Sequence, residues 1–402
     1  AKSIYLASAE GHSGKSSVAL GVLDTLLRST PRVGVFRPVT RSTAEPDFVL
    51  ELLLSRDGVT LDYDECVGVS YEEVHENPDA ALSRIVDRFK SVERKCDAVV
   101  IVGSDYTDVA TPTELAFNAR VAANLGAPVL LVLAGREPDE SRARTADELR
   151  QVAELALPEL ADAHASLLAI VANRVEPELL DAVADAVASV SGVPAWAIPE
   201  DPYLVAPTMS AVMGAVDGRL LKGDEALLAR EVLGIVIAGM SMENVLPRIM
   251  EGALVVIAGD RSEMLLAALT AHASGTFPSL AGIVLNGGFE LSPIIDRLIA
   301  GLDETLPIVT TDFGTYETAQ RIMQTRGRLT ATAQRKIDTA LALFDKHVDA
   351  ELLLRELGAG ESSAVTPLMF EYGLLERARS VPTRIVLPEG GDDRILQAAA
   401  TL

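Results

Sequence analysis

A short stretch near the start of the chain, AEGHSGKS at residues 9–16, has residue types that could bind phosphate. In a phosphate-binding loop, backbone N–H groups and the start of the following helix surround the anion. A lysine then reaches the outer oxygens, and the next hydroxyl binds magnesium. Gly14, Lys15 and Ser16 have these residue types in this order, directly after an apolar run. The spacing therefore predicts an anion-binding loop between a strand and a helix.

The first glycine of the motif is replaced by Ala9. Because that glycine ends the strand and does not approach the phosphate closely, we expect alanine to be tolerated there at a negative φ. The cofactor considered at this loop is ATP with magnesium, bound as an effector. The candidate phosphate- or nucleotide-binding residues of the loop are Ser13, Gly14, Lys15, Ser16 and Ser17.

A nucleotide hydrolase also needs an acidic residue at the end of a second strand, which holds magnesium through water. The segment DAVVIVGSDY offers that strand, but it ends in Val102 and Gly103, and Asp105 follows only in the loop. Ser16 and Asp105 are thus the candidate metal ligands. The alternative for Asp105 is a turn-capping aspartate.

The segments that must position this loop alternate between apolar β-rich runs and longer helix-like stretches. This alternation predicts an α/β fold, with a parallel sheet covered by helices on both faces, closing near Ile198. The predicted strands are residues 4–7, 33–36, 98–102, 129–133 and 167–171, and predicted helices include residues 18–27, 112–125 and 178–189.

A proline-rich join leads into a second alternating set, with strands predicted at residues 235–238, 254–258, 282–285 and 308–310. Asp260 and Arg261 follow one of these runs, as candidates for an effector or subunit contact, with a local ion pair as the alternative. Farther on, apolar residues at 3,4 spacing predict a one-sided helix over residues 335–357. We expect its apolar face to need a cover, which favours self-association.

Composition narrows the class of protein. The formal net charge of −23 over 402 residues disfavours binding to nucleic acid or to anionic membranes, and the length predicts two or three domains. The sequence has no apolar run of about eighteen residues and no secretory leader pattern, so a cytoplasmic protein is expected. Two cysteines, Cys66 and Cys96, are expected to be ordinary thiols.

The first 200 residues resemble the dethiobiotin-synthetase-like P-loop domain, through AEGHSGKS, VFRPVT, VGSDY and VANRV in the family's order. Arg37 stands where the synthetase has its substrate-handling lysine, and Val102–Gly103 where it has a Glu-Gly pair. Since arginine can bind phosphate but cannot replace lysine in carbamate chemistry, the resemblance implies the fold and not the reaction. Arg37 is a candidate phosphate ligand, and Asn173 a candidate base-reading residue, with an Asx turn as its alternative.

The rest of the chain resembles the long bacterial phosphate acetyltransferases. EDPYLVAPTMSAV, AGDRSE and LNGG are similar to their middle domain, which is named for an Asp-Arg-Thr-Gly-Gly signature; here only Asp260–Arg261 followed by Ser262 is close. TPLMFEYGLLERARS and RIVLPEGGDDRILQAAATL resemble the opening of the catalytic domain, with Asp392 or Asp393 expected to cap a helix.

This resemblance implies a P-loop domain at residues 1–199, a middle α/β regulatory domain at 200–316, a helical connector at 317–365 and the start of a third α/β, catalytic domain at 366–402. The family transfers acetyl between coenzyme A and phosphate, so acetyl-CoA and phosphate are expected as substrates of that last domain. We expect its catalytic residues beyond Leu402 and assign none. A small-molecule effector and a homo-oligomer, formed through the catalytic or middle domain, are implied. The alternatives are an ATP-dependent ligase of the dethiobiotin synthetase type and a nucleotide-free oligomerisation scaffold.

Overall fold

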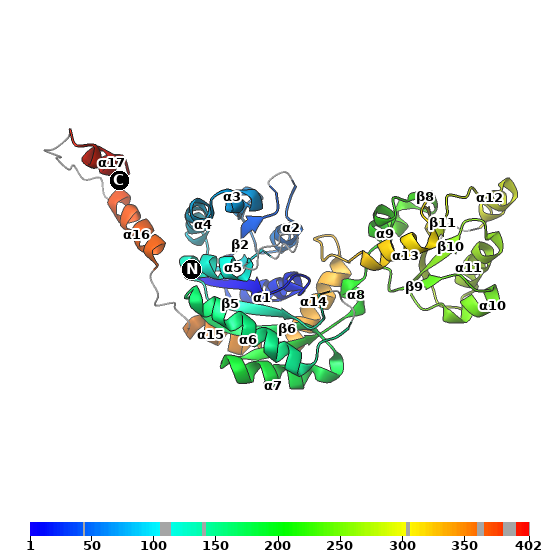
Figure 1. Ribbon diagram of the computed structural model, residues 1–402, viewed down its shortest axis with the longest axis horizontal. Helices are drawn as coiled ribbons and strands as arrows, with labels where there is room; N and C mark the ends of the chain where they lie inside the picture. Colours follow the sequence, from blue (N-terminus) through cyan, green and yellow to red (C-terminus); the bar gives the residue numbers. More distant parts are fainter. Residues whose placement is uncertain are drawn as a thin grey trace. The chain divides into compact units, whose positions relative to one another are not determined.

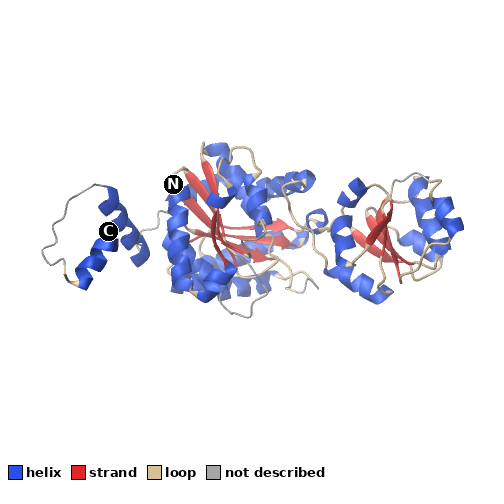
Figure 2. Ribbon diagram, turned by 90° about the horizontal axis from the view of Figure 1, so that it is seen from above, coloured by secondary structure: helices blue, strands red, loops and turns tan. Residues whose placement is uncertain are grey.

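The structure is a computed structural model that describes residues 1–402 except 43–44, 105–113, 139–141, 303–305, 360–365, 381–390 and 402. The chain forms two compact units (Figure 1). Unit 1 combines Ala1–Glu200 with Leu329–Leu402, and unit 2 is Asp201–Arg328. In both units, helices cover the two faces of a central sheet (Figure 2). The predicted α/β class is confirmed.

Unit 1 contains a seven-stranded sheet of order β3-β2-β4-β1-β5-β6-β7, in which every pairing is parallel. All five predicted strands are confirmed. The short strands β3 and β7 were not predicted, because a four-residue run containing glycine and a run ending in proline give little β signal. The strands are β1 Lys2–Ser8, β2 Val33–Thr40, β3 Val67–Ser70, β4 Ala98–Val102, β5 Val129–Ala134, β6 Leu167–Val175 and β7 Ala195–Pro199.

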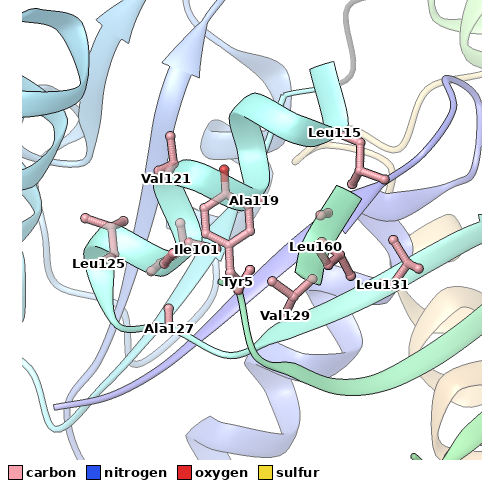
Figure 3. Close-up of a cluster of buried hydrophobic side chains, with 14 of the residues drawn as sticks. Tyr5, Ile101, Leu115, Ala119, Val121, Leu125, Ala127, Val129, Leu131 and Leu160 are labelled. Atoms are coloured by element: carbon pink, nitrogen blue, oxygen red, sulfur yellow. The ribbon is translucent and has the colours of Figure 1, made fainter. Parts of the chain in front are cut away.

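One face of this sheet packs against α4 to α7 in a continuous apolar core, part of which Figure 3 shows around Tyr5. Local signals define the helix starts: Thr145 and Glu148 form a capping box at α6, and Asn77 caps α4 ahead of Pro78. The helices before the linker are α1 Lys15–Ser29, α2 Phe48–Leu54, α3 Tyr71–Glu76, α4 Pro78–Glu93, α5 Glu114–Leu125, α6 Ala146–Asp162 and α7 Leu180–Ser191, with 3-10 turns at Tyr63–Glu65 and Pro177–Leu179.

The predicted single helix over residues 335–357 is wrong. Two helices, α14 Gln334–His347 and α15 Ala350–Ala359, are separated by Val348, whose backbone is extended at φ −112° and ψ 127°. Asp349 then accepts a hydrogen bond from the N–H of Leu352 at 2.9 Å and starts the second helix. The break shifts the helical phase, so Leu353, and not Leu352, continues the buried face.

Helix α14 packs against α1, within unit 1. The contact is close: a Cβ added at Gly21 would lie 2.2 Å from Cγ of Phe344, which is 1% exposed. Arg28 and Asp345 form an exposed ion pair, 2.8 Å long, between the same two helices. The apolar face that was expected to need a second molecule is therefore covered by this chain itself.

Unit 2 contains a five-stranded sheet of order β8-β12-β11-β10-β9, parallel except for the edge pair β8–β12. The four predicted strands are confirmed. Separate apolar clusters cover the two faces, one including α11 and the other including α9 and α13. The strands are β8 Arg219–Lys222, β9 Gly234–Ile237, β10 Ala253–Ala258, β11 Leu280–Asn286 and β12 Ile308–Thr310. The helices are α8 Pro202–Val205, α9 Met209–Ala215, α10 Met242–Val245, α11 Ser262–Ser274, α12 Pro293–Ile299 and α13 Thr315–Gln324, with 3-10 turns at Glu225–Ala229 and Leu246–Arg248.

The segment expected as a connector, residues 317–365, contributes to both units. It contains most of α13, which lies in unit 2, and also α14 and α15, which lie in unit 1. Beyond it are α16 Pro367–Ser380 and α17 Asp393–Thr401. Tyr372 of α16 packs on the unit 1 core, and its hydroxyl accepts a hydrogen bond from Arg94 at 3.0 Å. Asp392 accepts from the N–H of Arg394 at 2.9 Å and so caps α17. Residues 388–390, the first half of the PEGGDD turn, lie outside the described residues.

Both cysteines are buried free thiols. Burial raises the pKa of Cys66 to about 12 and also raises the pKa of Cys96, so both stay protonated near neutral pH. Within the part of the chain that the structure describes, no helix combines the length and apolarity needed to cross a bilayer.

Candidate functional site

The predicted anion loop connects β1 to α1 at the carboxyl edge of the unit 1 sheet. Gly14 stands immediately before α1 with a left-handed backbone, φ +71°. A Cβ at this position would lie 2.4 Å from Nδ2 of Asn173, so both the conformation and the space require glycine. His12 is exposed, and its backbone is also left-handed, at φ +59°.

Asn173, at the end of β6, supports the loop through its side chain. Its side-chain amide donates to the carbonyl oxygens of Ser13 at 2.9 Å and of Gly14 at 3.3 Å. Parallel pairing places the end of β6 beside β5 at the same sheet edge. The amide thus fixes the shape of the loop, and a contact with a base stays a prediction.

Two arginines also contact the loop. Arg144, which is 5% exposed, donates to both carboxylate oxygens of Glu10 at 2.5 and 2.8 Å and to the carbonyl of Ala134 at 3.1 Å. Arg174 donates to the carbonyl of His12 at 2.8 Å. Together with Asn173, these two arginines support the backbone of the loop.

The side chain of Lys15 is buried, and its ammonium donates to the carbonyl of Ser104 at 3.1 Å, just beyond β4. Ser104 is fixed in turn by Asn118, whose Oδ1 accepts from the Ser104 N–H at 3.1 Å and from the hydroxyl of Tyr5 at 2.6 Å. Burial raises the pKa of the Tyr5 hydroxyl, so it remains a proton donor. The lysine is therefore directed at the end of β4.

The loop hydroxyls differ in their surroundings. Ser17 Oγ donates to the carbonyl of Gly14 at 2.7 Å, and Ser16, the candidate magnesium ligand, is partly buried. Ser13 Oγ is buried and, among the described residues, has no hydrogen-bond partner. A buried hydroxyl without a partner beside a helix N-terminus and a lysine fits a site for an anionic oxygen.

Fewer observations support the predicted magnesium site than the predicted anion site. Asp105 lies outside the described residues, which contain no group of three or more His, Cys, Asp or Glu side chains placed to bind a metal ion. At the end of β4, Arg37 donates to the carbonyls of Val102 at 3.0 Å and Gly103 at 2.5 Å.

Arg37 is 3% exposed and also pairs with Asp47, its Nε lying 3.1 Å from Oδ2. The other oxygen of Asp47 accepts from the N–H groups of Val49 and Leu50, both at 3.0 Å, and caps α2. The structure therefore gives Arg37 a role in joining β2, β4 and α2. Its contact with phosphate stays a prediction.

In unit 2, Arg261 donates to the carbonyls of Ala238 at 2.7 Å and Met240 at 3.1 Å. The local ion pair considered for this loop is formed with Glu263, at 3.0 Å, while Asp260 is exposed. These bonds join the ends of β9 and β10. An effector or subunit contact at Asp260 and Arg261 stays a prediction.

Sequence reasoning missed Glu10 and Arg144 as loop supports. Arg144 follows β5 in an irregular segment with no motif, so only the three-dimensional structure brings it to Glu10, 134 residues away in sequence. Arg174 had a detectable signal, since it follows Asn173 directly in VANRV at a strand end.

Residues 2–208 match the family described as AAA domain, and residues 211–325 match the DRTGG domain. The chain belongs to the AAA domain family, and the loop described above lies within the matched residues.

More particularly, the chain is similar over almost its whole length to curated phosphate acetyltransferases, so the predicted resemblance to their long form is confirmed. It is 33% identical to the protein of Nitratidesulfovibrio vulgaris over 99% of this chain and 30% identical to that of Synechocystis sp. over 100%. It spans 58% of the length of both relatives.

Among solved structures, the chain is similar to the MinD cell division protein of Aquifex aeolicus, with 14% identity, a TM-score of 0.32 and coverage of 51% of this chain and 84% of that one. A nucleotide-binding protein of Archaeoglobus fulgidus in complex with ADP gives 18% identity, a TM-score of 0.30 and coverage of 50% and 82%.

Proposed function

We propose that residues 1–402 form the regulatory and assembly part of a phosphate acetyltransferase, which converts acetyl-CoA and phosphate to acetyl phosphate and coenzyme A. Similarity to such enzymes along the whole chain supports this, as does the order of its AAA and DRTGG domains. We keep the domain boundaries expected from the sequence, in which residues 366–402 are the start of the catalytic domain. The assembly that we propose is a homo-oligomer.

The P-loop is the proposed effector site, and it takes the phosphates of a nucleotide such as ATP. The observation that carries this is the buried Lys15 at a loop supported by Asn173 and Arg174. Beside it, the buried hydroxyl of Ser13 has no hydrogen-bond partner among the described residues. Ser16 would hold magnesium, which would neutralise phosphate charge. Since β4 ends in Val102 and not in an acidic residue, ATP is expected to bind with negligible turnover.

Calorimetry with ATP and magnesium tests the effector site. The wild-type chain is expected to bind ATP. Lys15→Ala should weaken this binding at least about tenfold, because one charge-assisted hydrogen bond is lost. Lys95→Ala is the matched control, because Lys95 is half exposed and pairs with Glu65 away from the loop. Phosphate release should stay at background in all three proteins.

The same measurements distinguish the regulatory function from a ligase and from a scaffold. Rapid ATP hydrolysis that Lys15→Ala abolishes would contradict the regulatory function and favour an ATP-dependent ligase. A wild-type chain that binds neither ATP nor inorganic phosphate would favour a scaffold without nucleotide. Light scattering that gives a strict monomer at tens of micromolar would count against the homo-oligomer.

Residues 1–402 are expected to release no coenzyme A from acetyl-CoA and phosphate. Acetyl transfer needs a phosphate site, a base near the thiol and donors for the tetrahedral oxyanion, and we place these in the part of the relatives that this chain does not match. The assay compares this chain with one extended through the catalytic domain. Equal rates would place the active site within residues 1–402.

A further inference from the structure

Arg174 has an unusual backbone for its residue type. It is the residue before the last in strand β6 and has a left-handed φ of +65°, a conformation that non-glycine residues rarely adopt. The adjoining backbone is crowded, since a Cβ at Gly135 would lie 2.4 Å from the carbonyl oxygen of Arg174. Its side chain is 10% exposed and passes beneath the P-loop, where Cδ lies 3.7 Å from the Cβ position of Gly14.

The guanidinium group joins two parts of unit 1. One nitrogen donates to the carbonyl of His12 in the P-loop at 2.8 Å, and the other lies 2.9 Å from Oε1 of Glu200. The second oxygen of Glu200 accepts a hydrogen bond from Arg136, and its side chain is 12% exposed. Charge-assisted bonds of this kind, largely withdrawn from water, are strong and directional.

Glu200 is the last residue of the first segment of unit 1, and residues 201–205, which we call the linker, follow it as the start of unit 2. Its N–H donates to the carbonyl of Val175 at 2.9 Å, which fixes it at the end of the sheet. The next residue, Asp201, begins unit 2 and accepts a hydrogen bond from the N–H of Tyr203 at 2.8 Å to cap α8. Arg174 therefore connects the anion loop to the residue that precedes the linker.

We propose that Arg174 and Glu200 couple occupancy of the P-loop to the order of the linker that starts at residue 201. A bound phosphate fixes the peptide of His12, because the loop N–H groups turn toward the anion. Arg174 is then held at its His12 end and keeps Glu200 in place. This inference rests on the proposed effector site. Thermodynamic linkage makes the coupling reciprocal: if ATP at the loop stabilises the ordered linker by some factor, loss of the Glu200 contact must weaken ATP binding by the same factor.

Hydrogen exchange at residues 199–205 and calorimetry, both with ATP and magnesium, test the coupling. In the wild-type chain, added ATP is expected to slow exchange in this segment. Glu200→Gln should remove that change and weaken ATP binding about fivefold or more. Glu176→Gln is the matched control: Glu176 also pairs with Arg136, at 3.6 Å, but its side chain is 44% exposed, so both readouts should match wild type.

Arg174→Lys is the second variant, because it keeps the charge but cannot reach His12 and Glu200 together; it should reproduce the effect of Glu200→Gln. Thermal unfolding confirms that each variant is folded. If the wild-type chain binds ATP but exchange at 199–205 is unchanged, or if Glu200→Gln and Arg174→Lys bind as wild type, the coupling is overturned and the effector site remains. If the wild-type chain binds neither ATP nor phosphate, both are overturned.

Discussion

Replacing Asp47 by alanine is expected to lower the free energy of unfolding of unit 1 by about 3–5 kcal/mol. The side chains of Arg37 and Asp47 are 3% and 7% exposed, so the variant would leave a guanidinium group buried without this carboxylate. The cap of α2 would be lost as well, because Asp47 accepts from the N–H groups of Val49 and Leu50. Both losses act beside the end of β4, next to the anion loop.

Urea unfolding followed by tryptophan fluorescence measures this effect, since the single tryptophan, Trp196, lies in β7 of unit 1. Asp47→Asn separates the two contributions, because asparagine can still cap a helix but lacks the charge. The control is Asp345→Ala, which breaks the exposed Arg28–Asp345 pair and should cost less than about 1 kcal/mol. Equal losses in the Asp47 and Asp345 variants would refute the role of the buried pair.

Phe344→Ala is expected to destabilise unit 1 by about 3–5 kcal/mol, the usual range for removing a buried aromatic ring. Its ring fills the space directly over Gly21, where a Cβ would lie 2.2 Å from Cγ. For that reason Gly21→Ala alone should also destabilise, by about 1–3 kcal/mol through overpacking. In the Phe344→Ala background the same substitution should stabilise, because the added methyl group then partly fills the cavity.

The four proteins of this double-mutant cycle are compared by the same urea unfolding. Leu155→Ala serves as control, since Leu155 is a large apolar residue on α6 that is 75% exposed, and its loss should cost less than about 0.5 kcal/mol. A Gly21→Ala effect of the same sign in both backgrounds would show that α14 does not pack over α1 in solution.

Much of the fold could be predicted because apolar runs such as AVVIV and VLLVLA are long and bounded by polar residues. The helix over residues 335–357 was wrong because its apolar spacing continues through Val348, and spacing alone does not reveal one extended residue. The sequence also did not reveal that residues after unit 2 return to complete unit 1. Gly21 and Phe344 are far apart in sequence, and nothing in their local sequences indicates that they pack together.

The anion loop could be predicted because its residues are contiguous and each has a fixed role. Its supports could not, because Glu10 and Arg144, or Arg174 and Glu200, meet only after the strands align at one sheet edge. Arg37 shows the opposite difficulty. Its charge and position suggested a ligand contact, whereas burial and Asp47 give it bonds within the protein.

Unit 1 is interrupted by unit 2, and this has a consequence for synthesis on the ribosome. Helix α1 emerges early, but α14, which covers it, follows only after the whole of residues 201–328, on the order of tens of seconds later at usual rates. Until then the groove at Gly21 exposes apolar surface to chaperones or to neighbouring nascent chains. Docking α14 also closes a very long loop, whose entropy grows only with the logarithm of its length, so the interruption delays completion of unit 1 far more than it weakens it.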